Sequence, residues 1–443
     1  MKLYRAFRVA PNQSLAFVGS GGKTTAIFQL AGELPPPVIV TATTHLGNWQ
    51  KSFADKHIIV ESNFEFNPLP DQLGRITLFT GLEDGNRFKP IGIKALDELH
   101  KFCKKNHITL LIEADGSRQK PLKGWADHEP PIPEFVDHVV HVAGLASLGK
   151  PLTQDTVHRP EIFSVLSDIQ PSQAITSDAI LRSSLNVHGA RKNFPSKVRR
   201  TILLNQADTH ETQATARSLA GKLLDGFDAV TISSLRQEKV FASHERIAGI
   251  VLAAGESSRL GRPKQLLDWH GEPFVRVVIK KAIEAGLFPI HLIVGANADE
   301  VVHVVDDLNV RVVLNPDWKQ GQASSIRSGI STILHNHDTL VGGVIFLLVD
   351  QPQVSVSVLQ TLKEKHAEGL YPVIAPFVMD RRANPVLFDR DTFSDLMKLE
   401  GDVGGRGIFH KHSVEYLPWH DDGLLLDVDT PEQYERLLSD KSL

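Results

Sequence analysis

Two short segments combine glycine or alanine with lysine, arginine and threonine, a combination that suits phosphate groups. The first is Gly19-Ser20-Gly21-Gly22-Lys23-Thr24-Thr25, and the second is Leu252-Ala253-Ala254-Gly255, followed by Arg259 and Lys264. Small residues let the backbone approach a ligand closely, and backbone N–H groups then bind phosphate oxygens. Lysine and arginine side chains neutralise the phosphate charge. The sequence therefore predicts two phosphate-binding loops.

Acidic residues end two apolar segments. Asp350 follows the apolar run Val344–Val349, and Glu113-Ala114-Asp115 follows Leu110–Ile112. Carboxylates at strand ends lie where open α/β sheets bind ligands, and Mg²⁺ prefers one or two carboxylates together with substrate phosphates. Asp350 and Asp115 are therefore candidate metal ligands. The alternative for Asp350 is a cap on the following turn.

The first loop lies between an expected strand and an expected helix. In such a loop Gly19, Gly21, Gly22 and the helix N-terminus would bind phosphate, Lys23 would reach the outer oxygens, and Thr24 would touch Mg²⁺, with Thr25 following. The spacing G-x-x-x-x-G-K-[ST] needs glycine at position 17, where Phe17 stands. The segment is similar to the shorter G-x-x-G-K-T-T loop of ligases that activate carboxylates with ATP. We expect it to bind ATP or GTP.

A further strand end, Asn205-Gln206-Ala207-Asp208, resembles the N-K-x-D guanine-reading motif of GTPases, with Gln206 in place of lysine. A turn that binds no ligand is an equal alternative here. His45, His128 and His158 are candidate metal or substrate ligands, although each alone is more typical of a structural residue.

Strands and helices alternate along the chain, which predicts mainly parallel sheets covered by helices, the α/β class. Apolar runs predict strands such as 15–18, 38–41, 108–112 and 138–142, and amphipathic stretches predict helices such as 23–33, 93–105 and 211–224. The polar segment 236–246 interrupts this series, and a new strand at 247–253 begins a second one. We therefore expect two domains, 1–242 and 243–443, with 236–246 as a short junction.

The composition excludes several classes of protein. With Cys103 as the only cysteine among 443 residues, the chain has no internal disulfide and no multi-cysteine metal site. Its net charge of −4 argues against a nucleic-acid-binding protein. The run Val344–Val349 is far shorter than the roughly 20 residues that span a bilayer. We expect a cytoplasmic protein that binds neither nucleic acid nor a membrane.

The segment from Leu252 to Lys264 resembles the LAAGxSxRxGxPK signature of the MobA-like nucleotidyltransferases that include the molybdenum cofactor cytidylyltransferases (MocA type). The resemblance covers about residues 247–438. It implies a Rossmann-like α/β domain that transfers CMP from CTP to a molybdopterin cofactor, because CMP-transferring members have Ala-Ala-Gly at 253–255. By this resemblance Leu252, Ala253, Ala254, Gly255 and Ser325 bind CTP, whereas Arg259, Lys264 and Asp350 are catalytic.

The same resemblance extends to three further segments. Asp427-Val428-Asp429-Thr430-Pro431 resembles the closing DxDTPED motif, which implies that Asp429, or alternatively Asp427, shares Mg²⁺ with Asp350. Asp429 or Thr430 could instead cap the last helix, as Ser324 could cap the helix that runs to Leu334. Residues 382–385 and 401–406 resemble the acceptor side, but Ala383 stands where members commonly have glycine, and a positive φ there would strain alanine.

Segments of the first half, including 19–25, 41–45, 113–118, 128–133 and 157–161, resemble the YqeC-type accessory protein of selenium-dependent molybdenum hydroxylases. This resemblance covers about residues 5–235 and implies a P-loop-like α/β domain that assists cofactor modification or insertion, with a molybdenum hydroxylase apo-enzyme as partner. Two alternatives remain open for the chain. It could be a cytidylyltransferase for another phosphorylated small molecule, or a molybdopterin carrier without turnover.

Overall fold

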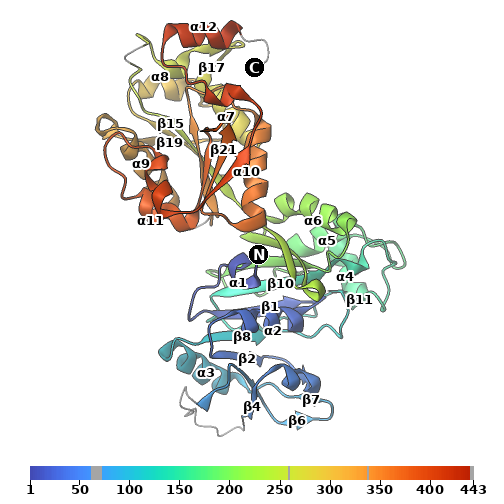
Figure 1. The fold of residues 1–443 in the computed structure, drawn as a ribbon. Helices are drawn as coiled ribbons and strands as arrows, with labels where there is room; N and C mark the ends of the chain where they lie inside the picture. Colours follow the sequence, from blue (N-terminus) through green and yellow to red (C-terminus); the bar gives the residue numbers. More distant parts are fainter. Residues whose placement is uncertain (61–71, 258–259, 337–338, 440–443) are drawn as a thin grey trace. The chain divides into compact units, whose positions relative to one another are not determined.

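The computed structural model describes residues 1–60, 72–257, 260–336 and 339–439. The chain divides into two compact units, Met1–Ser243 and His244–Leu443. Figure 1 labels many of the helices and strands of both units. Each unit is built on one large sheet with helices packed against it, so the α/β prediction is confirmed. No helix in the described ranges is long and apolar enough to cross a membrane.

The first unit has a nine-stranded sheet in the order β14-β13-β12-β10-β1-β8-β2-β5-β4. Neighbouring strands from β13 to β4 all pair parallel. The strands are β1 (Ser14–Gly19), β2 (Val38–Ala42), β4 (Lys56–Ile59), β5 (Ile76–Thr80), β8 (Thr109–Glu113), β10 (His138–Gly144), β12 (Arg199–Asn205), β13 (Ala229–Ser234) and β14 (Lys239–Glu245).

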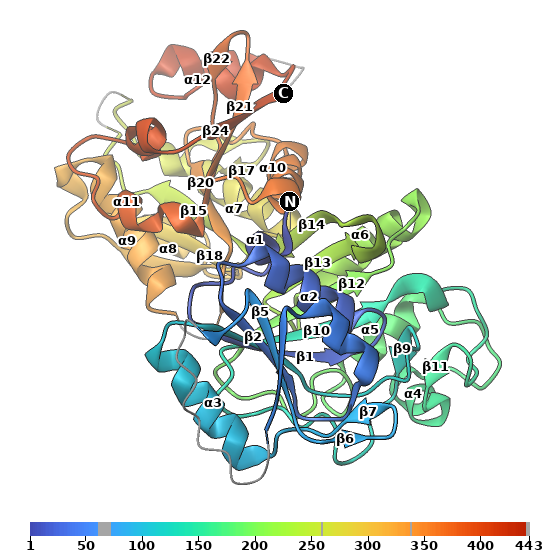
Figure 2. The same cartoon turned by 60° about the horizontal axis from the view of Figure 1, so that its bottom comes forward.

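The helices of this unit are α1 (Leu3–Ala6), α2 (Lys23–Glu33), α3 (Ile93–Lys105), α4 (Pro160–Ser167), α5 (Ser177–Leu185) and α6 (His210–Leu223). Two small sheets join β3 (Leu46–Gly47), β6 (Glu83–Asp84) and β7 (Arg87–Phe88), and β9 (Leu122–Lys123) with β11 (Val157–His158). Helix α2 packs against β1, β2 and β8 (Figure 2).

The central strands of the first unit are buried on both faces. Along β1, Leu15 and Phe17 belong to one apolar cluster, whereas Ala16 and Val18 belong to another. Because successive side chains of a strand point to opposite faces, both faces of this strand contact a hydrophobic core. The sheet is therefore a rigid base for the loop at the carboxyl end of β1.

The segment 236–246 is not the junction that the sequence predicts. After a short 3₁₀ turn, Leu235–Gln237, it forms β14 at the edge of the first sheet. Only Arg246 separates β14 from β15 (Ile247–Ala253), the first strand of the second sheet. The polar residues that suggested a linker are those of an edge strand, which is commonly charged.

The second unit has an eight-stranded sheet, in which β19, β18, β15 and β20 are parallel neighbours and β23 pairs antiparallel with both β20 and β21. Besides β15, the strands are β18 (Ile290–Val294), β19 (Arg311–Leu314), β20 (Gly343–Leu348), β21 (Val373–Val378), β22 (Arg381–Arg382), β23 (Val386–Asp389) and β24 (Val414–Pro418), with a separate pair, β16 (Asp268–Trp269) and β17 (Glu272–Pro273). The helices are α7 (Phe274–Glu284), α8 (Ala298–His303), α9 (Gln322–Leu334), α10 (Val356–Gly369), α11 (Phe393–Leu396) and α12 (Pro431–Ser439).

Candidate functional site

The loop between β1 and α2 has the backbone that its glycines predict. Gly19, Gly21 and Gly22 have φ angles of +89°, +88° and +131°. A Cβ atom at Gly22 would lie 2.4 Å from the side-chain nitrogen of Asn205. Both the left-handed backbone and this close approach require glycine. The loop therefore leads into the N-terminus of α2, where backbone N–H groups lack partners within the helix.

Lys23 is held at the start of α2 by the loop itself. Its Nζ atom donates to the Gly19 carbonyl at 2.6 Å and lies 3.0 Å from Asp115 Oδ1, and its side chain is 3% exposed. Asp115 also accepts hydrogen bonds from the Gly19 N–H at 2.9 Å and from Lys123 Nζ at 3.0 Å. Burial raises the pKa of Asp115, but Lys23 and Lys123 together outweigh burial and lower it.

These contacts give Asp115 a different task from the metal ligation that the sequence suggested. Its carboxylate is fully buried and compensates two lysine charges. Lys123 belongs to segment 120–123, which is also part of the YqeC resemblance, but the sequence assigned it no role, because a lysine in a short segment gives no sign that it is fully buried. Lys123 also contacts Glu129 at 3.1 Å, and Glu129 pairs with Arg159 at 2.5 Å.

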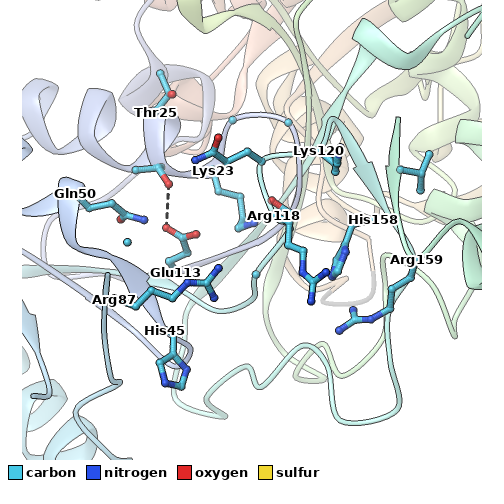
Figure 3. Close-up of a pocket in the computed structure, with 18 of the residues that line it drawn as sticks. Lys23, Thr25, His45, Gln50, Arg87, Glu113, Arg118, Lys120, His158 and Arg159 are labelled. Atoms are coloured by element: carbon cyan, nitrogen blue, oxygen red, sulfur yellow. Dashed lines mark hydrogen bonds between the residues drawn. The ribbon is translucent and has the colours of Figure 1, made fainter. Parts of the chain in front are cut away.

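A cleft of about 1270 Å³ opens beside this loop, and Figure 3 shows the side chains that line it. Lys23 and Glu113 lie near its centre, with Arg87 and His45 on one side and Arg118, His158 and Arg159 on the other. His128, the third candidate histidine, is exposed and does not line the cleft. Most of the charged groups around the cleft are cations, which favours an anionic ligand.

Glu113 is one of three glutamates that line this cleft, together with Glu129 and Glu161. It accepts a hydrogen bond from Thr24 Oγ1 at 3.2 Å (Figure 3). Burial raises the pKa of Glu113, although Lys23 acts in the opposite direction. Burial and the neighbouring Arg159 lower the pKa of His158 to about 4, so this imidazole is neutral at pH 7. No group of three or more His, Cys, Asp or Glu side chains could hold a metal ion in the described part of the chain.

In the second unit, Gln265 fixes the loop that follows β15. Its side-chain nitrogen is buried and donates to the carbonyls of Ala253 and Gly255, both at 2.8 Å. This pair of bonds joins the start of the loop to its end and positions the preceding residue, Lys264. Arg259, which the sequence assigns to the same loop, lies outside the described residues.

Lys264 connects the two carboxylates that the sequence assigns to a metal. Its Nζ atom lies 2.5 Å from Asp350 Oδ2 and 3.1 Å from Asp429 Oδ1. Burial lowers the pKa of Lys264, but the two carboxylates outweigh burial and raise it, so the ammonium group is charged. The other carboxylate oxygen of Asp350 is buried and has no hydrogen-bond partner within the described ranges.

Thr430, rather than Asp429, caps the last helix. Gln433 Oε1 accepts the N–H groups of Asp429 and Thr430 at 2.8 and 2.9 Å, and the Gln433 N–H donates to Thr430 Oγ1 at 3.4 Å. This reciprocal arrangement is a capping box. It leaves the Asp429 side chain available to Lys264.

Asp427, the other acid of this segment, makes its side-chain hydrogen bond with Gln351. Its Oδ1 atom accepts a hydrogen bond from Gln351 Nε2 at 2.7 Å. Burial raises the pKa of Asp427, and the nearby charges of Asp350 and Asp429 raise it further. Of the two acids in this segment, Asp429 has the direct contact with Lys264.

A second cleft of about 580 Å³ is lined by most of the residues assigned to CTP. Its lining includes Leu252, Ala254, Gly255, Lys264, Ser325 and Asp350. Ala253 is buried and is not among the lining residues. Asn315 Nδ2 donates to the hydroxyls of Ser324 and Ser325 at 2.9 and 3.0 Å. Ser324 donates to the Gly321 carbonyl and therefore does not cap α9.

A smaller pocket of about 280 Å³ shares Leu252, Gln322 and Leu348 with this cleft. Asn384 and residues 404–406 line it, so the two segments assigned to the acceptor meet in one place. Ala383 is buried and is absent from the residues with positive φ, so alanine fits there without strain.

Comparisons with known proteins match both units. Residues 15–161 match the family described as YqeC protein, and residues 249–416 match the MobA-like NTP transferase domain. The chain is 31% identical over 201 residues to nicotine blue oxidoreductase of Paenarthrobacter nicotinovorans, covering 43% of this chain and 96% of that protein.

Two proteins of Escherichia coli strain K12 are also similar. Uncharacterized protein YqeC is 31% identical over 206 residues, which cover 43% of this chain and 75% of that protein. Molybdenum cofactor cytidylyltransferase is 23% identical over 189 residues, which cover 42% of this chain and 92% of that protein.

Proposed function

Because the chain belongs to the YqeC family over residues 15–161 and to the MobA-like NTP transferases over residues 249–416, we propose that it matures the cofactor of a molybdenum hydroxylase. The second unit is a nucleotidyltransferase, and in this proposal it transfers CMP from CTP to a molybdopterin-type cofactor. The first unit binds ATP or GTP at Gly19–Thr25 and assists cofactor modification or insertion into the apo-enzyme.

The contact of Lys264 with Asp350 and Asp429 carries this proposal. A charged ammonium group beside two carboxylates, at a cleft large enough for a nucleotide, suits the chemistry of a triphosphate. In the reaction, an oxygen of the acceptor phosphate forms a bond to the α-phosphorus of CTP. The bond from the α-phosphorus to the bridging oxygen breaks, and its electron pair leaves with pyrophosphate.

Positioning and charge stabilisation supply the rate of such a transfer. Lys264 holds the phosphates and stabilises the negative charge that develops on pyrophosphate. No side chain has to remove a proton, because the attacking phosphate is already ionised. Gln265 binds the carbonyls of Ala253 and Gly255, and this contact supports the position of the neighbouring Lys264 for this role.

Asp350 and Asp429 fit Mg²⁺, since they offer two carboxylates and a buried Asp350 oxygen without a partner among the described residues. When bound there, the ion supplies neutralisation of charge on the phosphate oxygens. Lys264 contacts both carboxylates and compensates their charges where the ion would bind.

Three observations support CTP and a phosphorylated acceptor such as molybdopterin. The loop has the sequence Ala253-Ala254-Gly255. In addition, the chain is similar to a molybdenum cofactor cytidylyltransferase over most of the length of that protein. The smaller pocket, lined by Asn384 and Arg406, adjoins the nucleotide cleft and offers polar groups to a phosphorylated acceptor.

The test is pyrophosphate release by the full-length protein with Mg²⁺, molybdopterin and CTP, GTP, ATP or UTP in turn. We expect release with CTP to exceed release with the other nucleotides at least roughly tenfold, the discrimination of one good set of base contacts. Equal release with all four would contradict cytidylyl transfer. A phosphorylated sugar that replaces molybdopterin without loss of rate would favour a different acceptor, and cofactor binding without release would favour a carrier.

A further inference from the structure

The turn that follows β12 is fastened to the phosphate loop of the first unit. Asn205, the last residue of β12, donates its side-chain N–H to the Gly21 carbonyl at 2.6 Å. Its side-chain oxygen accepts the Leu235 N–H at 3.0 Å and the Ser233 hydroxyl at 3.2 Å. Asn205 is buried, so these bonds fix the turn relative to residues 19–25.

The carboxyl ends of β12 and β13 lie at the same edge of the sheet as the carboxyl end of β1, where the phosphate loop begins. In the sheet, β10 separates β1 from β12, and these strands run parallel (Figure 2). Gln206, the residue after Asn205, lines the same cleft as Lys23 and Thr24. Asp208 is exposed two residues beyond Gln206 and is not part of the cleft lining, so a nucleotide whose phosphates contact residues 19–25 reaches Asp208 when its base extends past Gln206.

Asp208 is the group in this turn that can distinguish between bases. The Ser234 hydroxyl donates to its Oδ1 atom at 2.5 Å, which orients the carboxylate. Its Oδ2 atom has no hydrogen bond within the described residues, and the residue is exposed. An ionised carboxylate only accepts hydrogen bonds. It needs a base edge that presents donors.

Guanine presents two adjacent donors, N1–H and the N2 amino group, whereas adenine presents an acceptor at N1 beside its amino group. A carboxylate accepts hydrogen bonds from both donors of guanine, whereas it repels the lone pair at N1 of adenine. We propose that the first unit is specific for guanine nucleotides and that Asp208 accepts hydrogen bonds from N1–H and the N2 amino group. This inference rests on the proposed nucleotide binding and narrows its ligand from ATP or GTP to GTP.

Isothermal titration of the full-length protein with GTP, ATP, ITP and XTP, each with Mg²⁺, tests the inference. Titration of the Lys23→Ala variant measures the nucleotide binding that does not depend on the first unit, and this background is subtracted from the wild-type binding. For the Lys23-dependent component, we expect GTP to bind roughly tenfold to a hundredfold more tightly than ATP. The affinity for ITP, which lacks the N2 amino group, should lie between the affinities for GTP and ATP.

The Asp208→Asn variant gives the sharper result, because its amide keeps an oxygen for Ser234 and gains a donor. Xanthine has a carbonyl where guanine has the N2 amino group, so Asp208→Asn should lose GTP affinity and gain XTP affinity, each by roughly tenfold or more. Asp225→Asn, an equal charge change at another exposed position of the first unit, should do neither. A purely structural role for Asp208 cannot produce the gain.

The outcomes separate this inference from the proposed function. Lys23-dependent binding of ATP as tight as GTP, or an Asp208→Asn variant that retains GTP and ignores XTP, overturns guanine recognition but leaves nucleotide binding intact. If Lys23→Ala changes the binding of none of the four nucleotides, both the inference and the proposed nucleotide site fail. CTP-dependent pyrophosphate release, measured on the same preparations, reports separately on the second unit.

Discussion

The ammonium nitrogen of Lys264 lies 2.5 Å from a carboxylate oxygen of Asp350, although 86 residues separate them in the sequence. The same nitrogen contacts Asp429, so one cation compensates two carboxylates, and Lys264 and Asp350 line the cleft of about 580 Å³. In the absence of ligand this contact keeps the carboxylates from repelling one another. Binding of a metal triphosphate would exchange it for contacts with phosphate oxygens.

Lys264→Ala should therefore lower kcat/KM for CTP-dependent pyrophosphate release by about 10²–10³-fold, the loss typical of one preorganised electrostatic group. Lys264→Arg, which keeps the charge, should lose less. Lys280→Ala removes a lysine of α7 that pairs with Glu272, and it should keep the wild-type rate. A Lys264→Ala enzyme with an unchanged rate would remove this residue from the reaction.

Asp350→Asn and Asp427→Asn should behave differently. Asp350 contacts Lys264 and has a buried oxygen without a partner in the described part of the chain, so Asp350→Asn should raise the Mg²⁺ concentration for half-maximal rate by roughly tenfold or more. Asp427 already accepts from Gln351, and asparagine keeps an oxygen there, so Asp427→Asn should change this concentration little. If both substitutions raise the Mg²⁺ concentration for half-maximal rate equally, Asp427 is a metal ligand as well.

Gly22→Ala should damage the first unit and leave cytidylyl transfer intact. The added Cβ would meet the Asn205 side chain at 2.4 Å, and φ is +131°, so we expect a cost of about 1–3 kcal/mol in unfolding free energy and weaker nucleotide binding. Gly221→Ala, on α6 where a Cβ meets nothing within 4 Å, should be neutral or stabilising by about 0.4–1 kcal/mol. Urea unfolding and nucleotide titration on both variants decide this comparison.

Asp115 makes the stability of the first unit depend on pH. Because folding lowers the pKa of Asp115 below its ordinary value of 3.8, the stability that Asp115 contributes is present above pH 3.8 and is lost as the pH falls through the folded pKa. Asp115→Asn removes the buried carboxylate charge that Lys23 and Lys123 share, and it should cost about 3–5 kcal/mol at pH 7 although Lys123 keeps its contact with Glu129.

Urea unfolding from pH 7 to pH 3, followed by the fluorescence of Trp49 and Trp125, measures this effect. The difference between wild type and Asp115→Asn should shrink as the pH falls below 3.8. Asp225→Asn supplies the control for a simple loss of charge. A difference that grows towards low pH would have the wrong sign and would contradict a lowered pKa.

The regular elements were largely accessible from the sequence, because apolar periodicity is local. The pattern predicted helices at 23–33 and 93–105, and the structure has α2 and α3 with those bounds. The strand Lys239–Glu245 was missed, because a single edge strand with polar residues lacks the apolar run of a central strand.

Within the two candidate sites, the sequence identified the charged side chains better than it identified their interactions. Asp350 and Asp429, which the resemblance assigned to a shared metal ion, both contact Lys264, which it assigned to the triphosphate. The pairing of Asp115 with Lys123 depends on packing that no spacing rule describes. Thr430 and Asp429 were equal candidates for the helix cap until the contacts of Gln433 separated them.

Strand β14 has a consequence for preparing the first unit alone. A fragment that stops at residue 242, where the sequence places the end of the domain, loses the last three residues of that strand and exposes the backbone of β13 beside it. Unpaired strand backbone recruits other chains, so such a fragment should aggregate during expression. A fragment extended through Glu245 keeps the whole edge strand and is the better starting point for isolated-domain studies.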